Sequence, residues 1–366
     1  MYTLIRKKLK FLITSCAICS VVLWLFDKEL MVETNDGSVY SDDVINAHDF
    51  HFTIANYDKC WNGTDATMTP FLLILVKTGP QNFYDRQQIR RTWGGTKMVL
   101  NELVSTMFLL GMSSDMELNQ RITKESQEYE DIVQENFFDS YHNLTIKIMM
   151  GLKWVATFCS NVSYVASADA DIMLNTVNLV NRLLSKPRKR YAEGTRMRNV
   201  VPVRDPNAHN GKWYTPFELY PDPTYAPFFP GSCYVMSGDL AWWIFLESRK
   251  VRYLPWDDVF FGLVLQRLGV DPAHGAGYGL YVKLSRNLTI TSVLMKGIGV
   301  LIPHRENSTD ERLLQLWNQT MALSERRIIN STNRDVSLVL CGIILFSILL
   351  IIFILGFFYI LVSFSF

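Results

Sequence analysis

The sequence predicts an α/β layer fold with a mostly parallel central sheet, in a single domain over residues 70–325. Short continuous apolar runs, which suit buried strands, alternate with segments of helical periodicity, as in parallel strands joined by helices. A chain of 366 residues is long enough for one large core. No G-x-G-x-x-G opens a helix after the first strand and no Walker A sequence is present, which argues against dehydrogenase or P-loop chemistry.

The elements of the first half follow from local patterns. Residues 71–76 and 107–111 are apolar runs and are expected to be strands. Between them, residues 86–93 have a helical pattern. Residues 115–130 predict a polar helix, and residues 144–158 an amphipathic one.

The second half continues the alternation. A strand is expected from Tyr164, and a second strand at residues 233–236. Residues 188–230 are rich in Pro, Tyr and charge and are expected to form loops around a site. Helices are predicted over residues 240–247 and from Pro255 to Gln266.

Two carboxylates end the Tyr164 strand. Asp169 and Asp171 are spaced i and i+2, so extended backbone would point both side chains to one face. Oxygen donors at the carboxyl end of a strand suit Mg²⁺ or Mn²⁺ holding a diphosphate, and ligands of open α/β sheets bind at that end. The alternative is a solvated turn, because such a spacing also arises by chance.

Charge and composition limit the partners. The formal net charge is +1 and the basic residues form no long stripe, so no nucleic-acid partner is expected. Apolar residues make up 49% of the chain, and many of them lie at its two ends.

The N-terminal segment predicts a signal anchor. Residues 1–10 carry four cations and are expected to be a cytoplasmic tail, and the uncharged residues 11–26 a transmembrane helix. A cleaved signal peptide is the alternative, but no clear A-x-A site follows. Residues 27–69 are polar and irregular and are expected to be a stem.

The C-terminal segment is also apolar. Residues 337–362 carry no charge and are long enough to form a second transmembrane helix. They also resemble a GPI-attachment signal, because Asn330, Ser331 and a polar spacer precede them.

The expected lumenal body carries secretory signals. At most one internal disulfide can form among Cys60, Cys159 and Cys233, and the pairing is left open. The N-x-[ST] acceptor sites support passage through the secretory pathway; they are Asn62, Asn143, Asn161, Asn287, Asn307, Asn318 and Asn330.

Six segments, in order over about residues 70–320, together resemble glycosyltransferase family 31, the β1,3-galactosyltransferase and β1,3-N-acetylglucosaminyltransferase group. They are similar to R-x-x-I-R-x-T-W at 86–93, F-L-L-G at 108–111, D-x-Y-x-N-L-T-x-K at 139–147, G-x-x-Y-V-x-S at 231–237, E-D-V-x-x-G at 257–262, and an H-x…W element at His304 and Trp317. Two departures are visible. Ser167 and Ala168 precede Asp169-Ala170-Asp171 where the family usually has a basic residue and three Asp, and Asp257 replaces the usual Glu.

The resemblance implies a GT-A-like, inverting UDP-sugar transferase. It places Asp258 as the catalytic base, although an Asp at a helix start could instead be an N-cap. It implies Asp171 as a direct ligand of Mn²⁺ or Mg²⁺, Asp169 near the metal or the ribose, and His304 as a third ligand. For His304 the alternative is an ordinary hydrogen-bonded histidine.

The nucleotide is expected to contact Arg86 and Arg90, which lie one helical turn apart, and Lys147. A solvated helix face is the alternative for the two arginines. Core packing is expected for Trp93 and Trp154. The candidates for acceptor contacts are Trp213, Tyr214, Tyr220 and Tyr225.

The expected function is transfer of galactose from UDP-galactose to a sugar hydroxyl in β1,3 linkage, on a glycoprotein or glycolipid, at the Golgi membrane. The donor could instead carry N-acetylglucosamine or N-acetylgalactosamine. An alternative of another class is an inactive sugar-binding or chaperone protein, suggested by the altered surroundings of Asp169.

Overall fold

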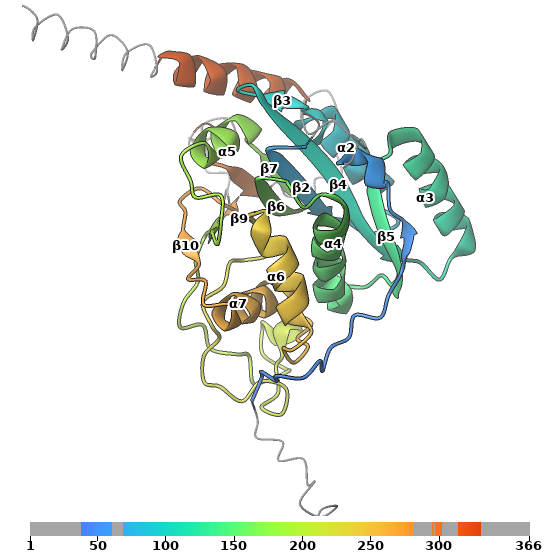
Figure 1. The fold of residues 1–366 in the computed structure, drawn as a ribbon, viewed down its shortest axis with the longest axis vertical. Coiled ribbons are helices and arrows are strands. Elements are labelled where there is room, and N and C mark those ends of the chain that lie inside the picture. The colour runs from blue at the N-terminus through green and yellow to red at the C-terminus, as the bar shows by residue number, and fades with distance from the viewer. Residues whose placement is uncertain (1–37, 61–68, 282–294, 296, 302–313, 331–366) are drawn as a thin grey trace, which may run out of the picture.

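The computed structural model describes residues 38–60, 69–281, 295, 297–301 and 314–330 (Figure 1). The predicted segments 1–10, 11–26 and 337–362 and the predicted ligand His304 lie outside these residues. Within them, no helix has both the length and the apolar character needed to cross a membrane.

Four parallel strands form the centre of a nine-stranded sheet. Their order is β5-β4-β2-β6, and every neighbouring pair among them is parallel. The strands are β2 (Leu72–Lys77), β4 (Glu102–Met112), β5 (Ile132–Phe138) and β6 (Tyr164–Asp169). β2 is buried along its whole length because helices cover both of its faces.

The outer strands make the sheet mixed. β9 (Cys233–Ser237) is antiparallel to β6, β8 (Ala192–Gly194) is antiparallel to β9, and β10 (Ala273–His274) is parallel to β8. On the other side, β1 (Phe52–Ile54) is antiparallel to β5, and β3 (Met98–Val99) is antiparallel to β4. The prediction of a mostly parallel sheet therefore holds only for the centre.

Two helical layers enclose the sheet (Figure 1). One hydrophobic cluster contains Leu73 and Leu75 of β2 and residues of three helices on one face of the sheet. A second cluster contains Leu72, Ile74 and Val76 of β2 and residues of the helices on the other face. The first layer holds α4 (Leu144–Phe158), α6 (Asp239–Ser248) and α7 (Asp257–Arg267). The second cluster includes residues of α2 (Phe83–Arg91), α3 (Met116–Tyr129) and α5 (Thr176–Leu183).

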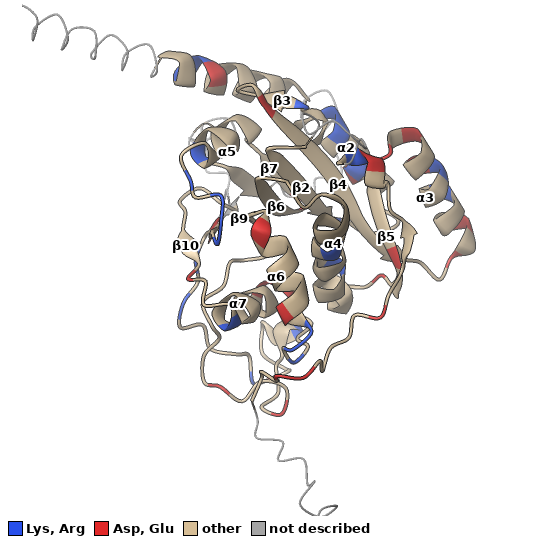
Figure 2. Ribbon diagram, in the orientation of Figure 1, with Lys and Arg blue, Asp and Glu red and all other residues tan. Residues whose placement is uncertain are grey.

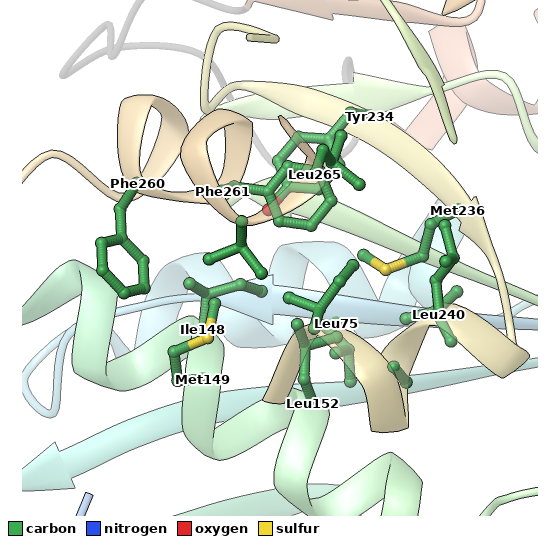
Figure 3. Packing of buried hydrophobic residues seen from close by; sticks show 14 of the residues in the cluster. Leu75, Ile148, Met149, Leu152, Tyr234, Met236, Leu240, Phe260, Phe261 and Leu265 are labelled. Carbon is green, nitrogen blue, oxygen red and sulfur yellow. The ribbon is translucent and has the colours of Figure 1, made fainter. Parts of the chain in front are cut away.

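Helix α4 packs closely on the sheet. A Cβ added at Gly151 would lie 2.6 Å from Leu109 Cδ1, so the absence of a side chain there permits the close approach. Beside this contact, Figure 3 shows Ile148, Leu152 and Leu75 in one cluster with residues of α6 and α7. The ring of Phe261 from α7 lies 4.5 Å from that of Tyr234, which fixes α7 against β9.

Residues 38–60 differ from the solvated stem expected there. β1 pairs with β5, Tyr40 Oη donates to Gln266 Oε1 at 2.6 Å, and His48 Nε2 lies 2.8 Å from Glu135 Oε2. A disulfide joins Cys60 to Cys159, while Cys233 is a buried free thiol. These contacts make residues 38–60 part of the domain.

A second, three-stranded sheet lies beyond β6, in the order β11-β12-β7. Its strands are β7 (Ile172–Leu174), β11 (Leu280–Tyr281) and β12 (Gly299–Leu301). Residues 314–330 are helical, and Trp317 from this helix is buried in the second cluster. The short 3-10 helices are η1 (Tyr57–Lys59), η3 (Trp93–Gly95), η4 (Tyr141–Asn143) and η5 (Gly211–Trp213).

Candidate active site

Charged side chains meet at the carboxyl ends of β2 and β6. Lys77 ends β2 and is the register partner of Asp169, which ends β6. The buried Lys77 Nζ lies 3.0 Å from Asp169 Oδ1 and donates to Asp257 Oδ2 at 2.6 Å and to Gly231 O at 2.9 Å. Parallel strands place these ends on one edge of the sheet, and α7 starts beside them with Asp257.

Two cavities open at this edge. The first has a volume of about 550 Å³ and the second about 520 Å³. They share a wall made of Lys77, Tyr141, Leu144 and Asp169. Two ligands could therefore lie on either side of one set of side chains.

Several charged and polar side chains line the first cavity. Asp169, Asp171 and Lys147 all line it, with Ser113, Ser140, Asn82 and Gln81. Asp171 lies in the turn between β6 and β7, not on extended backbone, so the strand geometry assumed for the i, i+2 pair does not apply to it. The turn nevertheless brings both carboxylates to the same cavity.

The second cavity contains Asp258 and is lined largely by apolar and aromatic side chains. Trp213, 42% exposed, and Tyr225 line it, together with Trp256 and Phe228. The other two tyrosines predicted for acceptor contacts lie elsewhere: Tyr220 is buried, and Tyr214 does not line this cavity.

Burial raises the pKa of Asp169 to about 6; Lys77 opposes that rise, and Asp257 and Asp171 add to it. Burial alone would lower the pKa of Lys77, but Asp169 and Asp257 outweigh it, so the pKa of Lys77 lies well above its ordinary value. The ammonium therefore stays charged and compensates carboxylates that would otherwise repel one another.

The same environment acts on Asp258. Burial, and after it the adjacent Asp257, raise the pKa of its carboxyl to about 7 against the opposing effect of the Val259 N–H, which donates to Oδ1 at 2.8 Å. The N-cap residue of α7 is Trp256, so Asp258 is not the cap that was the alternative to catalysis. A carboxyl with a pKa near 7 suits general base catalysis at neutral pH.

Lys147 reaches the first cavity from α4. Its Nζ donates to Thr78 O at 2.6 Å and lies 2.9 Å from Asp139 Oδ2, which also accepts from the Gly111 N–H. Burial lowers the pKa of Lys147, and Asp139 opposes that effect. This ammonium lies on the same cavity as Asp169 and Asp171, where a diphosphate would need a cation.

Neither Arg86 nor Arg90 lines either cavity. Arg86 is fully buried and binds Glu125, with Nη2 2.7 Å from Oε2, and it donates to Gly79 O at 2.7 Å. Arg90 pairs with Glu125 at 2.7 Å and with Asp131 at 2.8 Å. Figure 2 shows basic residues on α2 and both acidic and basic residues on α3. Direct nucleotide contact by the two arginines stays a prediction; the geometry shows support for the Gly79 loop, which lines the first cavity.

The donors fit a divalent cation in part. Among the described residues, no group of three His, Cys, Asp or Glu side chains could hold a metal ion. Asp169 and Asp171 supply hard oxygens at one cavity, and the third predicted ligand, His304, is not among the described residues. Two carboxylates suffice for a cation that takes its remaining ligands from water and substrate phosphates.

Lys77 is the site residue that sequence reasoning missed. It is a single charge at the end of the continuous apolar run Leu72–Val76, and no motif contains it. Its position could have identified it, because a charged residue at the carboxyl end of a central parallel strand lies where ligands of open α/β sheets bind.

Two adjoining cavities that share the side chains of Lys77, Tyr141, Leu144 and Asp169 suit a group transferase, in which a donor and an acceptor bind next to each other. The Galactosyltransferase family model matches residues 84–276, more than half of the chain. The chain belongs to this family and is a glycosyltransferase.

The similar named proteins are also galactosyltransferases. Beta-1,3-galactosyltransferase 1 of Mus musculus and of Homo sapiens are each 44% identical over 237 residues, covering 64% of this chain and 70% of the relative. Beta-1,3-galactosyltransferase 2 of Homo sapiens is 38% identical over 245 residues, covering 65% of this chain and 56% of the relative.

Solved structures are more distant. The galactosyltransferase LgtC, in complex with donor and acceptor sugar analogs, is 11% identical with a TM-score of 0.32, covering 68% of this chain and 95% of that one. The bifunctional glycosyltransferase WbbM is 9% identical with a TM-score of 0.36, covering 69% and 50%. These similarities are too low to assign a function.

Proposed function

We propose that this glycosyltransferase moves galactose from UDP-galactose to a sugar hydroxyl in β1,3 linkage, with inversion at the anomeric carbon. The observation that carries the proposal is the wall shared by two cavities, with Asp169 in the wall, Asp171 on one side and Asp258 on the other. The family and the beta-1,3-galactosyltransferase relatives support the sugar and the linkage. We place the fold in the GT-A class, as the family resemblance implies.

Asp258 is the catalytic base. An acceptor hydroxyl is a poor nucleophile, and a carboxylate must take its proton while the hydroxyl attacks the anomeric carbon. The second cavity holds Asp258 next to aromatic side chains on which a pyranose ring can stack, among them Trp213 and Tyr225. A pKa near 7 leaves about half of the Asp258 carboxyls ionised at neutral pH and makes each a stronger base than an ordinary Asp.

The first cavity receives the UDP moiety. Asp169 and Asp171, with His304, would hold Mn²⁺ or Mg²⁺, which when bound stabilises the charge of the departing UDP as a Lewis acid. Lys147 contributes a further positive charge to the same cavity from α4. Arg86 and Glu125 act indirectly by holding the Gly79 backbone in place.

We also propose that residues 11–26 anchor the protein in the Golgi membrane and that the domain over residues 70–325, extended by residues 38–60, lies in the lumen. Residues 337–362 would form a second span or a GPI-type signal. The apolar, uncharged character of both ends and the seven glycosylation sequons support this placement. The acceptor would then be a glycan on a secretory glycoprotein or a glycolipid.

The experiment uses the full-length protein in detergent with Mn²⁺ and a panel of UDP-sugars. UDP release is measured with and without glycan acceptors, and the linkage of the product is determined by NMR. We expect acceptor-dependent turnover with UDP-galactose, β1,3-linked product, and loss of turnover in EDTA. Preferred use of UDP-N-acetylglucosamine or UDP-N-acetylgalactosamine would overturn the donor assignment.

A further inference from the structure

Lys77 lies in the wall common to the two cavities and joins segments that are distant in the sequence. Its ammonium has three N–H donors, and the three partners are Asp169 at the end of β6, Asp257 at the start of α7 and Gly231 O before β9. Lys77 is only 5% exposed, so its charge has little water to solvate it and depends on these partners.

The backbone around this ammonium is tightly built. A Cβ added at Gly231 would lie 3.2 Å from Lys77 Nζ, so a side chain at this position would crowd the ammonium. The same loop is also tied to β6, because the Asp169 N–H donates to Ser232 O at 3.0 Å. The three segments are therefore held at one point.

We propose that Lys77 is a positioning residue that makes the donor cavity and the acceptor cavity act as one unit. Through Asp257 it fixes the start of α7, and with it Asp258, relative to the donor. Through Asp169 Oδ1 it orients a carboxylate whose other oxygen remains for a cation. This inference rests on the proposed function, because it assigns Asp169 to the donor and Asp258 to the acceptor.

The arrangement has a consequence for cation affinity. A positive ammonium 3.0 Å from Asp169 repels a divalent cation bound to the same carboxylate. Lys77 therefore weakens cation binding while it organises the reacting groups. A residue that merely supported the fold would do the opposite, since its loss would disorder Asp169 and weaken cation binding.

The test compares the full chain with Lys77→Met and Lys77→Arg. Binding of Mn²⁺ without nucleotide is followed by electron paramagnetic resonance at alkaline pH, because loss of Lys77 raises the pKa of Asp169 and a proton would otherwise compete with the cation. The kcat and KM are measured with UDP-galactose. For Lys77→Met we expect Mn²⁺ affinity to rise about fivefold or more, while kcat falls about 100-fold because Asp258 loses its placement. For Lys77→Arg we expect near-normal Mn²⁺ affinity and partial recovery of kcat. Weaker Mn²⁺ binding in Lys77→Met, or an unchanged kcat, would overturn the proposal.

Two further variants keep the test decisive. If Lys77→Met does not fold, the double variant Lys77→Met, Asp257→Asn removes one charge of each sign, and the same combination of tighter Mn²⁺ binding and low kcat is expected. The matched control is Lys153→Met. Lys153 pairs with the buried Glu135 at 2.7 Å and lines neither cavity, so normal Mn²⁺ affinity and kcat are expected.

The outcome is separable from that of the proposed function. Absence of galactose transfer by the wild-type protein would end the functional proposal. The Mn²⁺ measurement on Lys77→Met needs no turnover, so the effect of Lys77 on the cation site would still be decided by it.

Discussion

Asp258 shows how strongly one side chain depends on its surroundings. Burial and the adjacent Asp257 together place its pKa at about 7. The base is active only when deprotonated, so kcat/KM should rise as pH increases through about 7 and level off above it. A pH series of kcat/KM checks this, and an acidic limb near pH 4 would show that the carboxyl is not perturbed in the working enzyme.

Replacing the base should separate binding from turnover. We expect Asp258→Asn to bind UDP-galactose with nearly normal affinity and to lose about 10²- to 10⁴-fold in kcat, since only the proton acceptor is removed. Calorimetric titration gives the affinity, and UDP release with acceptor gives kcat. Normal turnover would disprove the catalytic assignment.

A substitution at Asp171 should weaken nucleotide binding and leave acceptor binding unchanged. Asp171→Ala removes one of the two carboxylates proposed to hold the cation at the first cavity, so Mn²⁺-dependent UDP binding should weaken about tenfold or more. Titration of UDP with and without Mn²⁺ measures this, and acceptor binding serves as the internal control. UDP binding that keeps its dependence on Mn²⁺ would remove Asp171 from the ligand set.

At the residue scale, four residues singled out from motifs at a strand end or helix start line the two cavities: Asp169, Asp171, Asp258 and Lys147. Their roles stay predictions. The sequence did not point to Lys77. The expected basic residue before the acidic motif is Ser167 here, and the positive charge comes instead from the adjoining strand. Pairing across strands is not visible in local sequence.

Among the elements, a helix or strand was predicted correctly where its polar and apolar residues followed a regular local pattern. Helix α4 was predicted with both ends correct. The polar helix predicted over residues 115–130 is α3, and the structure shows Asp115 as its N-cap, where the side chain accepts from Glu117 N and Leu118 N. Strand β5 was missed because buried polar residues interrupt its apolar pattern. Gln134 donates to Gly111 O, and the fully buried Glu135 pairs with Lys153.

The link between α2 and α3 gives a prediction about stability. Arg86→Met leaves Glu125 at a buried site with one of its two arginine partners removed, so the free energy of unfolding should fall by about 3–5 kcal/mol. Urea denaturation measures this. The control is Lys250→Met, whose more exposed pair with Glu247 at 3.2 Å should contribute no more than about 1 kcal/mol.

A second variant tests the predicted nucleotide contact. Glu125→Gln releases the Arg86 guanidinium without removing it. If Arg86 supports the Gly79 loop, UDP affinity should fall in both Glu125→Gln and Arg86→Met. Retained or increased UDP affinity in Glu125→Gln, with a loss in Arg86→Met, would instead show direct contact with the nucleotide.

Across the whole molecule, the Cys60–Cys159 disulfide closes a loop of sequence separation 99. Cys60→Ser and Cys159→Ser should each lower the free energy of unfolding by about 3–5 kcal/mol, and the double variant should lose little more. Thermal or urea denaturation measures the loss, and Cys233→Ala is the control that leaves the disulfide intact. Additive losses would show that the two cysteines act separately. Sequence left this pairing open because three cysteines permit three pairings.

The docking of residues 38–60 onto the sheet shortens the tether of the enzyme. If residues 11–26 span the membrane as proposed, only residues 27–37 separate the bilayer from the domain. Eleven residues reach at most about 40 Å, whereas the 43 residues of the predicted stem could reach about 150 Å. The two cavities would then stay within a thin layer next to the membrane that anchors the enzyme. Acceptors carried on that surface would meet it far more often than glycans drifting free in the compartment.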